Sequence, residues 1–281
     1  MSVLCFDCVA QHNDSLYRLK KLYESGLTEN NFEELKYTLQ NITDSDLENE
    51  SDSLKYIYYY CNAIYLDVVG GNQDKELECL EKSIDLRRAK LGIHHYEYLE
   101  LMLAYGILLE EISQDDAIIV YEKLLVDGIY TFLLDKVNTM RSYGMAMNGL
   151  AGLYEKKGYE KQLIDLYRWS FELLKSNYVK GDATSYYSLY MLSAYFYGKG
   201  RYMEAVEEMN KVLSYIEQNE GKVCAAYIRA LNYKAGCFVA CGDWIKARDC
   251  YMQSKHLQME LNGSVLEETL QYIDTLENLI E

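Results

Sequence analysis

The segment LSAYFYGKGRYMEA, at residues 192–205, decides the fold because two other stretches of the chain repeat its pattern. LAGLYEKKGYEKQL occupies residues 150–163, and KAGCFVACGDWIKA occupies residues 234–247. Gly158, Gly200 and Gly242 hold the same place in the three segments, so the repeat period is 42 residues. A Gly between two apolar helical runs is typical of a helix end with positive φ. The three segments therefore predict repeated pairs of helices.

A second repeated position lies five residues after each of these Gly residues. We expect two helices to approach closely there. The same frame extends towards the N-terminus with weaker matches, at intervals between 40 and 46 residues. The longest interval predicts lengthened helices near residues 125–145. We expect the close-approach positions to be Leu35, Leu77, Ala117, Leu163, Ala205 and Ala247.

Composition supports an all-α chain and excludes several classes of protein. The 281 residues include 29 Tyr and no Pro, and apolar residues recur at helical spacing. The formal charge is -16, which is unsuited to nucleic acid because phosphate contacts need Lys and Arg. The sequence contains no run of about 18 apolar residues, so no membrane-spanning helix is predicted. Eight dispersed Cys and a start unlike a secretory signal predict a cytoplasmic protein.

The charge is distributed unevenly along the chain. Residues 1–140 hold 26 acidic and 12 basic residues, whereas residues 141–281 hold 18 and 16. An anionic group of a partner, such as a peptide C-terminus, is therefore expected to be better tolerated by the second half.

The repeated segments resemble the tetratricopeptide repeat. Its pattern of Leu with Gly or Ala, then an aromatic residue, then Gly, then Ala is present in the last three units. The long period is similar to repeats of the kinesin-light-chain type and to the peptide-binding domains of bacterial quorum-sensing receptors. The resemblance implies an all-α, right-handed superhelical solenoid of antiparallel helix pairs, with about six repeats and a capping helix. We expect one domain over residues 1–281, with degenerate acidic repeats at 1–140, clear repeats at 141–263 and the cap at 264–281.

The resemblance also implies a binding groove, because the first helices of such repeats line the concave side. Asn148 and Asn232 occupy equivalent places there, and an Asn amide can bond both the N–H and the C=O of an extended peptide. Tyr side chains provide an aromatic face, and Arg229 is a candidate for a partner's carboxylate. The predicted binding residues are Arg141, Met145, Asn148, Glu155, Tyr187, Tyr190, Tyr197, Arg229 and Asn232. There are alternatives to a binding role. The Asn side chains could simply be solvated, and the Tyr residues could fill the space between helices.

Four groove positions carry small residues. Gly106, Gly152, Ala194 and Gly236 are equivalent in the repeat frame, and together they would open a channel along the inner wall. Leu99, Met102 and Leu109 would flank the first of them. Close helix packing is the alternative explanation for the same residues.

No catalytic motif is found, so we expect a protein that is not an enzyme and needs no cofactor. Cys5, Cys8 and His12 give three metal-ligand types, but a structural zinc site needs four. The acidic run from Asp44 to Asp52 lacks the Gly and Glu of a calcium loop, so a solvated connection is favoured. Adjacent His94 and His95 point apart on a helix, and the pair Cys237 and Cys241 suits packing better than redox chemistry. We therefore predict no metal site.

Three functional hypotheses follow. The first is a scaffold or adaptor that holds a segment of another protein or peptide in the groove, without nucleic acid or membrane. The second is a bacterial sensor of signalling peptides that acts through a partner protein. The third is a structural subunit, in which Tyr-rich faces join copies of the chain or a larger complex.

Overall fold

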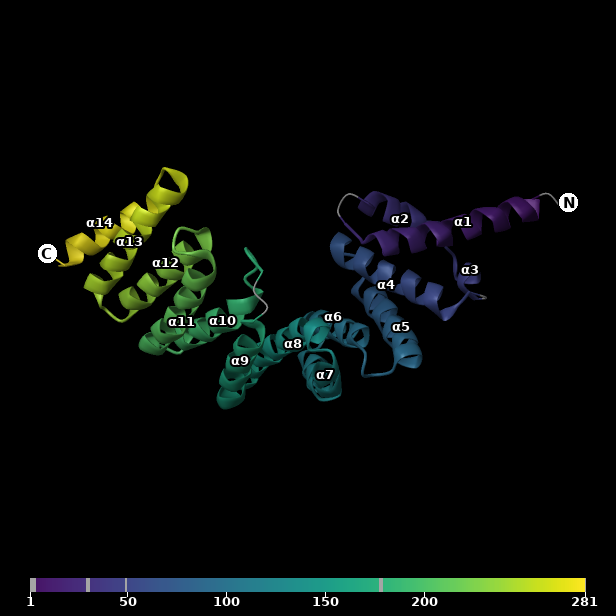
Figure 1. The fold of residues 1–281 in the computed structure, drawn as a ribbon, viewed down its shortest axis with the longest axis horizontal. Helices are drawn as coiled ribbons and strands as arrows, with labels where there is room; N and C mark the ends of the chain where they lie inside the picture. Colours follow the sequence, from purple (N-terminus) through teal and green to yellow (C-terminus); the bar gives the residue numbers. More distant parts are fainter. Residues whose placement is uncertain (1–3, 29–30, 49, 177–178, 281) are drawn as a thin grey trace. The chain divides into compact units, whose positions relative to one another are not determined.

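The computed structural model describes residues 4–28, 31–48, 50–176 and 179–280, with side chains from Ser15 onward. Every regular element in these ranges is an α-helix, or a short 3-10 turn beside one, and none of them contains a strand (Figure 1). The chain divides into two compact units, at residues 1–146 and 147–281. The all-α prediction is therefore confirmed, and each unit is described by itself.

The first unit is built from neighbouring helices that pack in chain order. The helix α4 packs on α5, α5 on α6 and α6 on α7, while α1 packs on both α2 and α4. Leu19, Leu35, Cys61 and Leu124 are fully or almost fully buried between these helices. Its helices are α1 (Leu4–Ser25), α2 (Phe32–Gln40), α3 (Asp44–Glu48), α4 (Asp52–Val69), α5 (Gln73–Leu91), α6 (Tyr96–Ile112), α7 (Gln114–Leu134) and the first part of α8 (Lys136–Lys157).

The second unit continues the same arrangement with more regular pairs. Each helix from α9 to α13 packs against the next one in the sequence, so that α14 ends the series (Figure 1). Leu192, Phe196 and Met209 lie in the resulting core. Its helices are the rest of α8, α9 (Glu160–Leu174), α10 (Thr184–Gly198), α11 (Tyr202–Glu220), α12 (Ala225–Ala240), α13 (Trp244–Asn262) and α14 (Glu267–Ile280).

The three repeated Gly residues end their helices as the sequence predicts. Gly158, Gly200 and Gly242 have φ values of 77°, 72° and 77°. The residue after each Gly donates its N–H to a carbonyl five residues earlier, as with Arg201 to Phe196 at 2.8 Å. This is the Schellman arrangement, which satisfies the last free carbonyls of a helix and turns the chain back. The 42-residue period is therefore a period of identical helix ends.

The predicted close-approach positions lie in the core. Leu35, Ala117, Leu163, Ala205 and Ala247 have no exposed surface, and only Leu77 is partly accessible. At Ala205 the approach is short enough for the Ser193 hydroxyl on α10 to donate to the Ala205 carbonyl on α11, at 2.7 Å. A larger side chain at residue 205 would push these two helices apart.

Replacing Gly200 tests the helix end directly. Gly200→Ala is expected to lower the free energy of unfolding by about 1–2 kcal/mol, because Ala is strained at positive φ. Two residues earlier, Gly198 lies within α10 and has ordinary φ, and a Cβ added there would meet nothing within 4 Å. Gly198→Ala is therefore the matched control, with an unchanged or slightly raised stability. Urea denaturation followed by circular dichroism measures both; equal losses would contradict the role given to Gly200.

Helix lengths follow the repeat spacing. The helices α7 and α8 have 21 and 22 residues, against 15 each in α9 and α10, as the long interval predicts. The predicted terminal helix is α14, which buries Ile273 and Leu276 against α13. Gln258 on α13 also binds it, donating to the Thr269 hydroxyl at 2.9 Å and accepting from the Leu266 N–H at 2.8 Å. These contacts attach α14 to the end of the second unit.

Candidate functional site

A cluster of Tyr rings joins the first helices of two neighbouring pairs in the second unit. On α10, the rings of Tyr190 and Tyr197 lie 5.1 and 6.1 Å from the ring of Tyr233 on α12. Tyr197 also meets Tyr202 at 5.3 Å. Tyr187 and Tyr197 are exposed, at 47% and 41% of their surface, so the cluster continues into a solvent-facing aromatic face. Its composition suits contact with another polypeptide.

Arg229 lies beside this face on α12 and is exposed. Burial raises the pKa of Tyr190 and of Tyr186, and the positive charge of Arg229 opposes that increase in both. The guanidinium is therefore near the phenol groups of α10. Because Arg can form two parallel hydrogen bonds with a carboxylate, Arg229 provides an anion-binding group at the edge of the aromatic face.

Asn148 and Asn232 share a second property besides their equivalent positions. The side-chain amide oxygen of each is shielded from water, and neither oxygen has a hydrogen-bond partner among the described residues. Leaving a buried acceptor unpaired costs about 1–3 kcal/mol. Both side chains are nevertheless partly accessible, so rotation of each amide would bring its oxygen to an N–H donor from outside. Two acceptors are thus free at matching places on α8 and α12.

The small residues differ from one another in their surroundings. A Cβ added to Gly236 would meet nothing within 4 Å, and one on Gly152 would only touch the Tyr167 hydroxyl oxygen at 3.7 Å. A Cβ on Gly106, however, would lie 2.6 Å from the ring of Tyr121. Gly106 is thus a helix-packing residue between α6 and α7, and the channel predicted there is wrong.

The groove positions that flank Gly106 are also corrected. Leu99 has no exposed surface, and Met102 and Leu109 have 5% each. All three belong to the core of the first unit. The spacing that assigns groove-facing positions on α8, α10 and α12 therefore selects core positions on α6.

The remaining predicted residues lie on α8. Glu155 is exposed near the end of that helix, in the second unit. Arg141 is exposed and Met145 is partly buried, but both belong to the portion of α8 in the first unit. Ring contacts in the second unit join Tyr190 and Tyr197 to Tyr233 and Tyr202, which the sequence frame omitted. The predicted residues that belong to this unit are Asn148, Glu155, Tyr187, Tyr190, Tyr197, Arg229 and Asn232.

The candidate metal and redox residues have structural roles where they are described. The Asp46 carboxylate accepts the Thr43 N–H at 2.6 Å at the start of α3, a short helix within the predicted acidic connection. His95 accepts the Glu97 N–H and caps α6, and Cys237 is buried as a free thiol.

The side chains of Cys5, Cys8 and His12 lie outside those described. Among the described residues, no three metal-ligating side chains gather, and no helix has the length and apolarity needed to cross a membrane.

Sequence comparisons give no match: neither a protein-family model nor a curated protein resembles this chain closely enough. Solved structures do match. A Podospora anserina structure of putative kinesin light chain TPR-like repeats has a TM-score of 0.58 at 16% identity, covering 76% of this chain and all of the other. The apo quorum sensor NprR from B. thuringiensis has a TM-score of 0.57 at 14% identity, covering 95% and 69%.

A third similar structure is a Rap protein complexed with competence and sporulation factor. It has a TM-score of 0.51 at 11% identity, covering 96% of this chain and 80% of the other. At such low identity, these similarities define the fold: helix pairs of the TPR-like type, as the sequence predicts.

Proposed function

We propose that this protein is a non-enzymatic binding protein that holds an extended peptide segment on the face formed by α8, α10 and α12 of its second unit. The single observation that carries the proposal is the pair of unpartnered, water-shielded amide oxygens on Asn148 and Asn232. A backbone N–H of a bound peptide would satisfy each oxygen, with no requirement on the peptide's side chains.

The Tyr face and Arg229 give this site its other contacts. The rings of Tyr187, Tyr190 and Tyr197 offer flat apolar surface with a polar edge to the peptide's side chains. Arg229 offers a partner for a carboxylate of the peptide, such as its C-terminus. The second half of the chain has a net charge of only -2, with 18 acidic and 16 basic residues, so it does not repel an anionic group strongly.

The test uses a displayed library of random 12-residue peptides, selected on the wild-type chain. Asn148→Ala and Asn232→Ala are each expected to lower the affinity for the selected peptides about tenfold, because each leaves a peptide N–H unpaired. Asn210→Ala is the matched control, since Asn210 is exposed on α11, a second helix of its pair. Fluorescence polarisation measures affinity, and circular dichroism checks folding. Peptides that bind both groove variants as well as they bind the wild type would refute the proposal.

A short, free signalling peptide is the second candidate ligand. NprR has been solved in complex with its cognate peptide NprX, at a TM-score of 0.51 and 14% identity to this chain, and the Rap structure contains competence and sporulation factor. A sensor would be stabilised by a short peptide alone, whereas an adaptor would need a segment of a larger partner. A rise in Tm with short peptides distinguishes the two, because a ligand that binds only the folded state increases its stability.

A further inference from the structure

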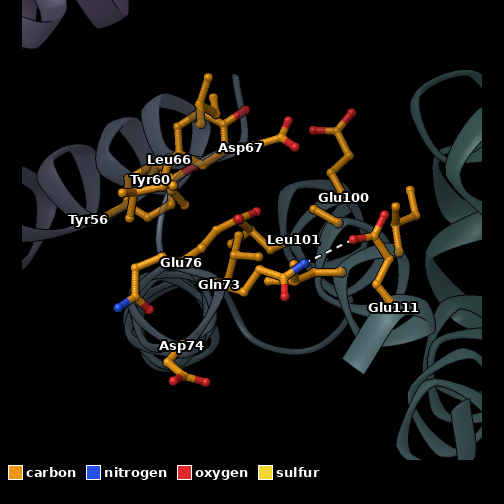
Figure 2. Close-up of a pocket in the computed structure, with 18 of the residues that line it drawn as sticks. Tyr56, Tyr60, Leu66, Asp67, Gln73, Asp74, Glu76, Glu100, Leu101 and Glu111 are labelled. Atoms are coloured by element: carbon orange, nitrogen blue, oxygen red, sulfur yellow. Dashed lines mark hydrogen bonds between the residues drawn. The ribbon is translucent and has the colours of Figure 1, made fainter. Parts of the chain in front are cut away.

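A cavity in the first unit lies between α4, α5 and α6 and is also lined by Tyr23 of α1. Its volume is about 960 Å³, at the upper end of the range of small-ligand sites. Its described lining contains Tyr, Asp and Glu residues but no Lys or Arg. Figure 2 shows the carboxylates of Asp67, Glu76, Glu100 and Glu111 turned towards a common space, and Asp74 also belongs to the lining.

Glu76 distinguishes this cavity from an ordinary acidic surface. Only 8% of its surface is exposed, yet its carboxylate has no hydrogen bond or ion pair among the described residues. Burial raises the pKa of Glu76, and the nearby charges of Asp67 and Glu111 raise it further. A buried carboxylate is normally paired, because removal from water is costly. Because this carboxylate is open to the cavity, a cation that enters the cavity could pair with it.

The other carboxylates are arranged differently. Glu97 is paired with Arg87, at 2.9 Å, and so its charge is already balanced. Glu111 accepts a hydrogen bond from the Gln73 amide at 2.9 Å, which fixes it at the edge of the cavity (Figure 2). A neutral amide does not cancel the charge of Glu111. The pKa of Glu100 is raised by loss of hydration and by Glu97. The cavity therefore keeps an excess of negative charge.

The opposite wall is aromatic. The rings of Tyr23, Tyr56 and Tyr60 lie within 6.1 Å of one another. The guanidinium of Arg87 already lies over the Tyr56 ring, 3.4 Å from its centre. Arg87 therefore already occupies the Tyr56 ring, and a bound cation would use the rings of Tyr23 and Tyr60. An aromatic surface opposite carboxylates is the usual environment for ammonium and guanidinium groups.

We propose that this cavity binds an organic cation of the alkylammonium or guanidinium class, with the Glu76 carboxylate as its ion-pair partner. The cation is supplied by a free amine or by a Lys or Arg side chain of a partner peptide. This site is separate from the Asn and Tyr face of the second unit, so either proposal stands if the other fails.

Isothermal titration calorimetry of the full chain tests the proposal with two probes. Cadaverine represents a free amine, with 1,5-pentanediol as its neutral control. The peptide Ac-Gly-Lys-Gly-NH2 represents a side chain, with its Nε-acetylated form as the neutral control. We expect at least one cationic probe to bind and neither neutral control to do so. The tighter cationic probe identifies the source, and binding by neither cation would overturn the proposal.

The matched variants are Glu76→Gln and Glu78→Gln, which each remove one negative charge from α5. Glu76→Gln is expected to lower the affinity for the cationic probe at least tenfold, since a charge-assisted hydrogen bond is lost. Glu78→Gln is expected to change affinity less than twofold, because Glu78 is exposed, does not line the cavity and is paired with Lys82 at 2.6 Å. Equal losses in the two variants would overturn the proposal, because they would show only a general attraction to an acidic protein.

Thermal denaturation separates loss of the site from loss of the fold. Because the pKa of Glu76 is raised by folding, its ionisation at pH 7 reduces the stability of the free protein. Glu76→Gln is therefore expected to raise Tm at pH 7 while it weakens cation binding. A fall in Tm would show that the carboxylate has a partner within the protein, which would also overturn the proposal.

Discussion

Leu163→Ala is expected to lower the free energy of unfolding of the second unit by about 2–5 kcal/mol. Leu163 begins the buried face of α9 and has no exposed surface. Removing its branched end leaves a cavity in the core of the second unit, which a closely packed interior only partly refills. Urea denaturation followed by circular dichroism at 222 nm measures the change.

The control for this prediction is Leu266→Ala. Leu266 precedes α14 and has 60% of its surface exposed, so its loss is expected to cost less than about 0.5 kcal/mol. A loss at Leu163 no greater than the loss at Leu266 would show that the close-approach position does not hold the helix pairs together.

Gly106→Leu and Gly236→Leu are expected to have opposite consequences, although the two Gly residues are equivalent in the repeat frame. Gly106→Leu places new atoms against the Tyr121 ring, which is fully buried and bonded through its hydroxyl to Glu110 at 2.6 Å. The ring has no room to move, so a loss of roughly 2–3 kcal/mol is expected. Gly236→Leu meets open space and replaces a poor helix former, so stability is expected to stay the same or to rise.

The same pair also tests where the groove lies. Gly236→Leu projects a side chain from α12 near Asn232 and is expected to block peptide binding in a protein that remains folded. Circular dichroism and the peptide affinity assay together measure both effects. A folded Gly236→Leu protein with unchanged affinity for its selected peptides would place peptide binding elsewhere.

The helix ends and the core positions were predictable from one sequence because they are local and repeated. Gly158, Gly200 and Gly242 recur at a constant interval, and the requirement for positive φ leaves few alternatives to Gly. Ala205 and Ala247 follow from the same frame. The sequence could not show which Gly residues in the helix interiors face open space, because a small residue suits both a groove and close packing. Gly106 and Gly236 differ only in what the neighbouring helix brings to them.

The binding residues were harder to predict than the core. Tyr233 was missed because it lies one position beyond the expected helical face, and only the packing of α12 on its neighbours brings its ring to Tyr190. The cation cavity was missed for a different reason. Asp67, Glu76 and Glu100 are on three helices, and each alone resembles an ordinary solvated charge. Only the burial of Glu76 distinguishes it, and burial is not written in the local sequence.

Contacts within each unit run mainly between helices that are neighbours in the chain. An added or deleted helix pair would therefore need to match only two bordering surfaces. Duplication of a whole 42-residue segment is a simple genetic route to a longer stack of helix pairs, with a longer surface. The three segments that end at Leu163, Ala205 and Ala247 retain the similarity expected of such copies. Engineered chains with one extra copy of residues 201–242 could lengthen that surface without redesign of the existing core.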